Sequence, residues 1–506
     1  MLRLLKNNKE LSIIILIAFF LRVIGFWHGF PIIFNVDEPA LVRSALGIRF
    51  TPNPHHFDWP HLHFYLNALL YSVYIKFRGA ALGFPFLQET VLWRDPVIFY
   101  LISRIFNAVL GALTIIPIYF TAKSIYNKRA GVMASLLFTV FVLHVRASHF
   151  ALIDVPTTFW LAFSVLFASK ALAAPSYRNY LLSGLFAGFA MSTKYNGLFA
   201  SLSLAVTHLI LLMRDRKLLT TSEFYLKPMI AFLVCVGGFL LGTPYALFDY
   251  ATFARTDSPI GALWQFTNVG SVTFGKHLLN FFFYSPLTLI RDLGYTPFIL
   301  FVCFIAYSLV HILRSRGREQ NRTHLERLLF IALPALLIIY NVSGYDKTRS
   351  HYYMPSYTFI ALGGGLFLAS VTRTKRHMQL ALISLVIPLV LSLYQVFILS
   401  IKDTRIIAYD YLERTKPSTL IYKGEEFKEA AVRFKSTAKV VKLRNVSDIN
   451  LYNTGHFVLI NPVRANPLND VPYSVPFPKV MTIDNKFRNG PQIDIYVLSP
   501  ILYEAN

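Results

Sequence analysis

Apolar blocks of roughly 17–25 residues recur along this chain, and each is long enough to cross the hydrocarbon core of a bilayer. Of the 506 residues, 55% are hydrophobic and only 15% are charged. A soluble protein usually carries about 25% charged residues, so most of this chain lacks the polar surface that a large soluble fold needs. We therefore predict an α-helical polytopic membrane protein with about eleven transmembrane helices.

The predicted spans are Leu11–Phe30, Val97–Ser124, Ala130–Val145, Val155–Ala174, Tyr180–Thr193, Gly197–Met213, Pro228–Phe248, Pro297–Leu313, Leu328–Val342, Met354–Val371 and Leu380–Ile401. His61–Phe77 is also apolar but carries several polar side chains, so it is expected to form an interfacial helix. The basic start of the chain could open a signal peptide. No small-residue cleavage site follows it, and a retained first helix is predicted instead.

Charge predicts the orientation of these spans. Cytoplasmic loops of membrane proteins are enriched in Lys and Arg. With the N-terminus in the cytoplasm, the inner helix ends carry twenty basic and five acidic residues, whereas the short outer loops carry four basic residues. Much of the net charge of +23 thus marks topology, and no nucleic-acid partner is predicted. The expected location is the cell membrane, or the endoplasmic reticulum membrane in a eukaryote.

The predicted organisation is a membrane domain over residues 1–401 and an extracytoplasmic domain over residues 402–506. Two long outer loops, 31–96 and 249–296, interrupt the membrane domain, and the first should hold interfacial helices. The tail has ordinary polarity and is expected to fold as a small α/β domain. Its predicted elements are a helix at Thr404–Arg414 and strands at Thr419–Tyr422, Val440–Leu443, Phe457–Ile460 and Ile493–Leu498.

Two acidic positions stand at the outer ends of helices. Asp37 and Glu38 follow the first span, and Asp154 opens the fourth. Ionisable groups at the mouth of a membrane domain need a reason to be there, and a general base is one such reason. The structural alternative is a helix cap, because Asp before Glu-Pro or Val-Pro suits a helix N-terminus.

Two basic segments lie on the same predicted side. Lys194 sits in the tight turn Lys194–Gly197, and Lys347, Arg349 and His351 alternate along Tyr345–Tyr353. Arg offers a fork of donors that matches phosphate, so together these side chains could bind one anion. The alternatives are a snorkelling lysine and an ordinary interfacial loop rich in aromatic residues.

A histidine-rich run lies in the first outer loop, between Asn53 and Tyr65. It comprises His55, His56, Asp58, His61 and His63. A divalent metal is conceivable here, but the spacing fits no tight ligand template. A segment that contacts the acceptor or the carrier is the favoured interpretation.

These groups gather carboxylates and cations on one membrane face, without any Gly-rich phosphate loop in the sequence. Nucleotides are scarce outside the cytoplasm, so a transfer reaction there needs an activated donor that the membrane delivers. A polyprenyl-phosphate sugar is such a donor. Its phosphate is already a good leaving group, so one base and phosphate-binding cations suffice and no cofactor is required.

The same residues resemble a known family, the GT-C membrane glycosyltransferases. The resemblance is greatest to the branch of the protein O-mannosyltransferases and the lipid A aminoarabinose transferase. The matching pieces, in order, are Asp37-Glu38, the Pro-aromatic helix around Pro60–Tyr65, Arg104 with its apolar run, Ser148–Pro156, Ser192–Gly197, His351–Pro355 before a Gly-rich helix, and Lys402–Glu413.

The resemblance implies inverting transfer of a sugar from a polyprenyl-phosphate carrier to a hydroxyl or phosphate of a lipid, glycan or protein. It implies Asp37 as the base, with Glu38 as the alternative, and Asp154 as a second acidic position. It places Lys194 and the loop residues Lys347, Arg349, His351 and Tyr352 at the carrier phosphate. Arg104 and the histidine run are candidate substrate contacts. The competing hypothesis is a transporter or flippase of an amphipathic lipid-linked anion.

Overall fold

A computed structural model describes residues 8–82, 97–314, 317–372, 374–443, 455–461, 478–485 and 488–498 of the chain. It divides into two compact units. The first comprises Met1–Ile24 and Ala40–Gln395, and the second comprises Gly25–Pro39 and Val396–Asn506. The predicted domain boundary after residue 401 stays a prediction, and residues 83–96 of the predicted first outer loop lie outside the described residues.

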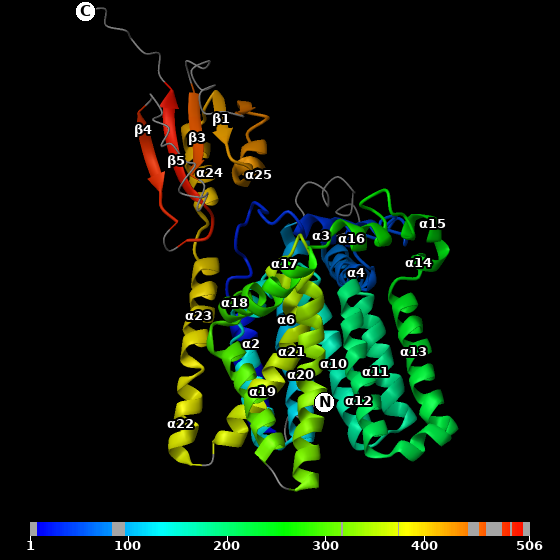
Figure 1. Ribbon diagram of the computed structural model, residues 1–506. Coiled ribbons are helices and arrows are strands. Elements are labelled where there is room, and N and C mark those ends of the chain that lie inside the picture. The colour runs from blue at the N-terminus through cyan, green and yellow to red at the C-terminus, as the bar shows by residue number, and fades with distance from the viewer. Residues whose placement is uncertain are drawn as a thin grey trace, which may run out of the picture. The chain divides into compact units, whose positions relative to one another are not determined.

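Helices account for nearly all of the regular structure before residue 401 (Figure 1). The longer ones are α2 (Lys9–Val23), α3 (Glu38–Gly47), α4 (Leu62–Leu82), α6 (Val97–Leu113), α7 (Ile115–Ile125), α8 (Lys128–Thr139), α10 (Asp154–Ala173), α11 (Tyr177–Met191), α12 (Ser201–Arg214), α13 (Ser222–Gly242), α19 (Thr296–Arg314), α20 (Arg318–Ser343), α21 (Met354–Val371), α22 (Lys375–Ile383) and α23 (Val386–Ser400).

Further helical segments connect these helices. They are α9 (Val142–Ala147), η2 (Tyr195–Ala200), η3 (Arg216–Thr220), α14 (Tyr245–Phe248), α15 (Tyr250–Phe253), α16 (Ala262–Asn268), α17 (Phe274–Leu279), the π-helical turn η4 (Asn280–Tyr284), α18 (Ser285–Leu293) and η5 (Ser350–Tyr353). The predicted second outer loop, 249–296, is therefore a chain of short helices.

In the described part of the chain, eight helices are long and apolar enough to cross a membrane. Three further predicted spans form the shorter helices α2, α8 and α11, of 15, 12 and 15 residues. A helix of 15 residues is about 22 Å long, less than the roughly 30 Å of bilayer hydrocarbon. The multi-pass helical membrane class is confirmed, and the number of eleven crossings stays a prediction.

The first predicted span was wrong at its end. Leu11–Phe30 was expected to be helical throughout, but α2 ends at Val23. Gly25 and Gly29 adopt φ values of +93° and +77°, a left-handed conformation that ends a right-handed helix. In contrast, the predicted interfacial helix His61–Phe77 is confirmed as a helix, because α4 covers Leu62–Leu82.

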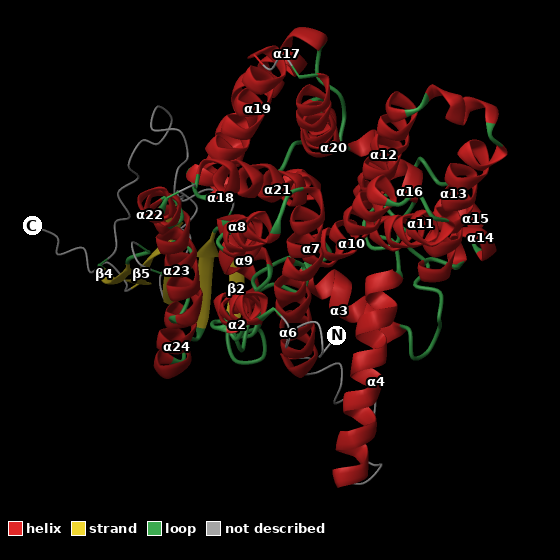
Figure 2. Cartoon of the chain, turned by 90° about the horizontal axis from the view of Figure 1, so that it is seen from below, coloured by secondary structure: helices red, strands yellow, loops and turns green. Residues whose placement is uncertain are grey.

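Small residues allow close helix packing in the first unit. Helix α11 packs between α10 and α13, as the end-on view shows (Figure 2). A Cβ atom at Gly184 would lie 2.2 Å from the carbonyl oxygen of Ala231, and one at Gly188 would lie 2.3 Å from that of Cys235. This Gly-x-x-x-Gly spacing lets two backbones touch, which is how helices associate without a hydrophobic driving force in lipid.

The second unit contains a five-stranded mixed sheet. Its strands are β1 (Thr419–Lys423), β2 (Lys439–Lys442), β3 (Gly455–Asn461), β4 (Lys479–Ile483) and β5 (Gln492–Leu498), in the order β2-β1-β3-β5-β4. β1 pairs in parallel with β2 and β3, and β5 pairs antiparallel with β3 and β4. The helical segments are α24 (Thr404–Thr415), η6 (Glu425–Phe427) and α25 (Lys428–Val432). The predicted helix and four strands are confirmed, and β4 was not predicted.

Candidate functional site

A buried ion pair forms the centre of the site in the first unit. Asp154 is the first residue of α10, and Lys194 lies in the turn between α11 and η2. The Lys194 Nζ atom donates to Asp154 Oδ1 at 2.5 Å, and the two side chains are 17% and 10% exposed. The sequence thus placed both residues correctly at helix ends, and the fold brings the two together.

The predicted capping role of Asp154 is not observed. The residue before it, Ile153, takes the N-cap position, and no side chain caps α10 there. A carboxylate in the first turn still suits the positive end of the helix dipole. Its specific contact is the Lys194 ammonium, so its carboxylate pairs with another candidate site residue rather than serving only the helix end.

Two aromatic residues of η5 border this pair. The Lys194 Nζ atom lies 5.2 Å from the centroid of the Tyr352 ring, within the range of a cation–π interaction. The His351 ring stands nearly perpendicular to that of Tyr352, with the centroids 4.8 Å apart. His351 also interacts electrostatically with Asp154 and Lys194. The structure therefore gathers four of the predicted site residues.

Asn107 on α6 supports this site and was not predicted. Its Nδ2 group donates to the carbonyls of Phe150 and Leu152, both at 2.7 Å, and its side chain is fully buried. Those two carbonyls belong to the turn that leads into Asp154. The sequence did indicate Asn107 in one respect, because a polar amide within a predicted span is costly in lipid. Such a residue needs a structural or functional reason to be there.

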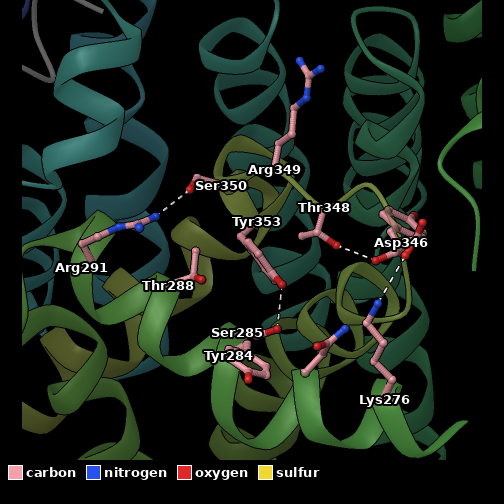
Figure 3. Close-up of a pocket in the computed structure, with 12 residues that line it drawn as sticks. Lys276, Tyr284, Ser285, Thr288, Arg291, Asp346, Thr348, Arg349, Ser350 and Tyr353 are labelled. Atoms are coloured by element: carbon pink, nitrogen blue, oxygen red, sulfur yellow. Dashed lines mark hydrogen bonds and ion pairs between the residues drawn. The ribbon is translucent and has the colours of Figure 1, made fainter. Parts of the chain in front are cut away.

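The same short helix η5 separates the ion pair from a polar cavity. In a 3₁₀-helix, residues three apart lie on one side. Ser350 and Tyr353 share that relationship and both line a cavity of about 330 Å³, while His351 and Tyr352 lie toward Lys194. The cavity is drawn in Figure 3, and its other lining residues are Lys276, Asn280, Tyr284, Ser285, Thr288, Arg291, Tyr345, Asp346, Thr348 and Arg349.

Three cations and one carboxylate line this cavity. Arg291 donates to Ser350 Oγ at 3.1 Å and to Asp292 at 2.9 Å, and Lys276 lies 3.4 Å from Asp346. The guanidinium of Arg349 points away from Lys276 at the edge of the group (Figure 3). The lining carries a positive excess among hydroxyl and amide groups, which is the chemistry that holds a phosphate.

Lys276 and Arg291 were also absent from the sequence-based site. They lie on α17 and α18, within the loop 249–296, and the fold brings them next to the 345–353 segment. The one signal in the sequence was two cations in a long loop on the predicted outer side. Nothing local to those residues indicates which other loop they approach.

The predicted alternation of Lys347, Arg349 and His351 does not place these side chains at one point. Lys347 donates to Asn268 Oδ1 at 2.9 Å, Arg349 lines the cavity, and His351 interacts with Asp154. The reason is that the segment turns into η5 after Arg349 instead of staying extended. The three side chains make separate contacts here, and their binding of one anion stays a prediction.

The histidine run divides into separate contacts. His56 bonds to Ser44 Oγ at 2.8 Å and to Asp58, while His55 lies 3.8 Å from Asp249. Burial by itself would raise the pKa of Asp249. Hydrogen bonds, chiefly from Asn53, nevertheless hold this pKa below its usual value.

The last two histidines of the run are fully buried. The ring of His61 stacks on Phe57, and that of His63 stacks on Phe106, with centroids 4.6 Å and 5.5 Å apart. Within the described residues, no three His, Cys, Asp or Glu side chains form a group able to hold a metal ion. Arg104 is also buried, at 1% exposure, on α6.

The first acidic pair belongs to the second unit. Asp37 is half-buried, and its backbone N–H donates to Asn35 Oδ1 at 2.9 Å. Glu38 is fully buried and opens α3. Both residues therefore have defined positions within their segment, and their chemical roles stay predictions.

Sequence comparison matches part of the membrane region. The family model described as dolichyl-phosphate-mannose-protein mannosyltransferase matches residues 101–241, which include Asp154 and Lys194. Over 158 residues the chain is 32% identical to dolichyl-phosphate-mannose–protein mannosyltransferase 1 of Saccharomyces cerevisiae. That match covers 29% of this chain and 19% of the relative, so the chain spans about a fifth of the relative's length.

Structural comparison covers nearly the whole chain. The archaeal oligosaccharyltransferase AglB from Archaeoglobus fulgidus, solved with an inhibitory peptide and a dolichol-phosphate, has a TM-score of 0.52 at 14% identity. The alignment covers 90% of this chain and 70% of AglB. ArnT from Cupriavidus metallidurans in the apo state has a TM-score of 0.51 at 12% identity, covering 98% and 99%. At such identities the likeness establishes the fold alone, and over residues 101–241 the chain is similar to the dolichyl-phosphate-mannose-protein mannosyltransferases.

Proposed function

We propose that this chain is an inverting membrane glycosyltransferase that moves a sugar from a polyprenyl-phosphate carrier to an acceptor at the extracytoplasmic membrane face. The observation that carries the proposal is the pair of neighbouring polar sites on the two sides of η5. One is the Asp154–Lys194 pair, and the other is the cavity lined by Lys276, Arg291 and Arg349. The family match and the name of the yeast relative support a lipid-phosphate sugar as donor.

The donor phosphate suits the cation-lined cavity. A phosphate that leaves with the bonding electron pair gains negative charge, and preorganised cations stabilise that charge in the transition state. Arg291 and Lys276 come from short helices of one loop, and Arg349 comes from the segment before η5. AglB was solved with a dolichol-phosphate, and we assign this cavity to the equivalent polyprenyl phosphate here.

The proposed reaction is one displacement. The acceptor oxygen attacks the anomeric carbon from the face opposite the phosphate, and a new glycosidic bond forms as the bond from carbon to phosphate oxygen breaks. The electron pair leaves with the polyprenyl phosphate. The acceptor proton passes to a carboxylate base, which is Asp37, with Glu38 as the alternative. Because attack and departure occur on opposite faces, the anomeric configuration inverts.

We assign Asp154 and Lys194 to the sugar and phosphate end of the donor. The carboxylate can accept hydrogen bonds from sugar hydroxyls, and the ammonium can contact an anionic oxygen. In the absence of a ligand each neutralises the other at 2.5 Å, which keeps a charged pair stable at a largely buried position.

The proposed sidedness follows from charge. The basic residues concentrate at helix ends on one predicted side, which the positive-inside rule assigns to the cytoplasm. The site residues fall on the opposite predicted side, where a lipid carrier can supply activated sugar. The acceptor is a hydroxyl or phosphate of a lipid, a glycan or a protein.

The test uses purified protein in lipid nanodiscs with a panel of radiolabelled polyprenyl-phosphate sugars. We expect loss of donor, release of polyprenyl phosphate, and label in an acceptor pool of peptides, glycans or lipids. The Asp37→Asn/Glu38→Gln double variant is the control for the chemical step. Movement of intact labelled lipid across a vesicle membrane, without formation of a glycosidic bond, would instead establish a flippase.

A further inference from the structure

The segment Asp403–Glu413 lies at the start of the C-terminal tail. Its polar side chains hold the guanidinium of one arginine in a fixed orientation. Asp403 caps α24 by accepting from the backbone N–H of Arg405 at 2.9 Å. The same carboxylate holds the Arg405 side chain through Nε at 2.8 Å and Nη2 at 2.7 Å, and Asn489 donates to it at 3.1 Å. Asp403 and Arg405 are 2% and 12% exposed, so this guanidinium plane is locked in one orientation.

The locked guanidinium lies on an aromatic ring from the distant start of the chain. The Arg405 Cζ atom is 3.8 Å from the centroid of the Phe34 ring. An arginine stacked on a ring gains both electrostatic attraction and apolar contact. Phe34 packs at the edge of the core that α24 and the sheet form, so the loop 25–39 is part of this unit.

Two further contacts hold the same loop. Ile32 is 2% exposed and belongs to the hydrophobic core that also contains Leu412. The carbonyl of Pro31 accepts from Arg433 Nη2 at 2.8 Å. Three of the four positions from 31 to 34 are therefore attached to the C-terminal part of the chain, by a hydrogen bond, by packing and by a stacked cation.

Asp37 follows Phe34 by three residues, a distance of at most about 11 Å along an extended chain. Asn35 shortens this link further, since its side chain accepts from the Asp37 N–H at 2.9 Å and closes a local turn. Without these contacts the loop residues would keep their backbone conformational freedom.

We propose that Phe34 and Arg405 are positioning residues that fix the backbone carrying the Asp37–Glu38 pair, so that the C-terminal domain is required for catalysis as the support of the base. This inference rests on the proposed function for the role of Asp37. It explains why the tail opens with the sequence Asp-Thr-Arg, because the first and third residues build the fork that meets Phe34. A misplacement of about 1 Å at a reacting group can cost on the order of a hundredfold in rate.

The experiment compares Arg405→Ala and Phe34→Leu with Arg414→Ala, which removes an exposed arginine from the same helix. We expect kcat to fall by about tenfold to a hundredfold in the first two variants, with an unchanged KM for the donor. Phe34→Tyr should restore most of kcat, because the stacked ring returns. Combined with Asp37→Asn, Arg405→Ala should cause no further loss.

A second readout does not depend on the reaction. Hydrogen exchange of the full chain should show faster amide exchange over residues 31–37 in Arg405→Ala, and wild-type exchange there in Arg414→Ala. A raised donor KM with unchanged kcat, or unchanged exchange in the loop, would overturn the positioning role. If wild-type protein transfers no sugar while the exchange result holds, the proposed function fails and the anchoring stands. Thermal unfolding of each variant separates both results from general loss of folding.

Discussion

The ammonium of Lys194 lies 2.5 Å from a carboxylate oxygen of Asp154, at a position where both side chains are largely shielded from water. The loss of one partner leaves a buried charge without compensation, which costs about 3–5 kcal/mol. Lys194→Met should therefore lower both the thermal unfolding temperature and the transfer rate. The double variant Asp154→Leu/Lys194→Met should recover stability but not activity.

Thermal unfolding in detergent and initial-rate assays on the same preparations check this prediction. Lys128, whose exposed side chain pairs with Glu10, provides the matched control. Lys128→Met should leave the unfolding temperature nearly unchanged, because surface ion pairs contribute little to stability. A double variant with wild-type transfer would refute the assignment of the pair to the site.

The cavity cations should determine donor affinity. Arg291→Ala and Arg349→Ala each remove a charged donor, and a hydrogen bond to a charged group contributes about 1.5–3 kcal/mol. The expected result is a rise of roughly tenfold to a hundredfold in the donor KM or Kd, measured by titration with polyprenyl phosphate. Arg255→Ala is the control, because Arg255 lies in the same loop but pairs with exposed Asp257. Equal effects of Arg255 and Arg291 would point to general electrostatic attraction instead of a phosphate site.

The two adjacent carboxylates can be separated by isosteric replacement. Asp37→Asn should lower the single-turnover rate by about 10²–10⁴-fold, the usual contribution of a general base. Glu38→Gln should have a smaller effect on chemistry, because Glu38 is fully buried whereas Asp37 is partly accessible. Size-exclusion chromatography of each variant checks that it remains folded. Full activity in Asp37→Asn, combined with loss in Glu38→Gln, would transfer the role of base to Glu38.

His61 predicts a pH dependence of stability. Burial lowers its pKa to about 4, against about 6.5 in an unfolded chain. Between these values the unfolded state binds more protons than the folded state, so stability is complete above pH 6.5 and falls as the pH drops toward 4. The full difference is about 3 kcal/mol.

Thermal unfolding of His61→Gln from pH 7 to pH 4 should show a shallower decline than wild type. His55→Gln is the control, because the His55 side chain is 67% exposed. If both variants keep the wild-type slope, other groups cause the acid sensitivity of the fold.

The helical core could be predicted because lipid leaves a chain few choices. A spanning segment must be apolar and must satisfy its own backbone hydrogen bonds. Its position can therefore be predicted from a run of consecutive apolar residues. Asp154 and Lys194 stood out for the same reason, as charges at the ends of apolar runs. The direct contact between these two side chains could not be predicted from the sequence, because it depends on how α10 packs against α11.

The parts that were missed depend on distant segments. Lys276 and Arg291 become site residues only when α17 and α18 approach the 345–353 segment. Strand β4 is short, and it is defined by antiparallel pairing with β5 rather than by a strong local pattern. The attachment of the loop 25–39 to the C-terminal part of the chain joins distant positions, as the hydrogen bond from Arg433 to Pro31 across 402 residues illustrates.

Under the proposed function, the four-residue helix η5 limits how the donor preference can change. Ser350 and Tyr353 line the cavity, while His351 and Tyr352 border the ion pair, so a substitution that shifts this helix disturbs both environments at once. Lys276 and Thr288 shape the cavity from α17 and α18 instead. Evolution or engineering of a new donor preference should therefore proceed by changes in those two helices, with η5 left intact.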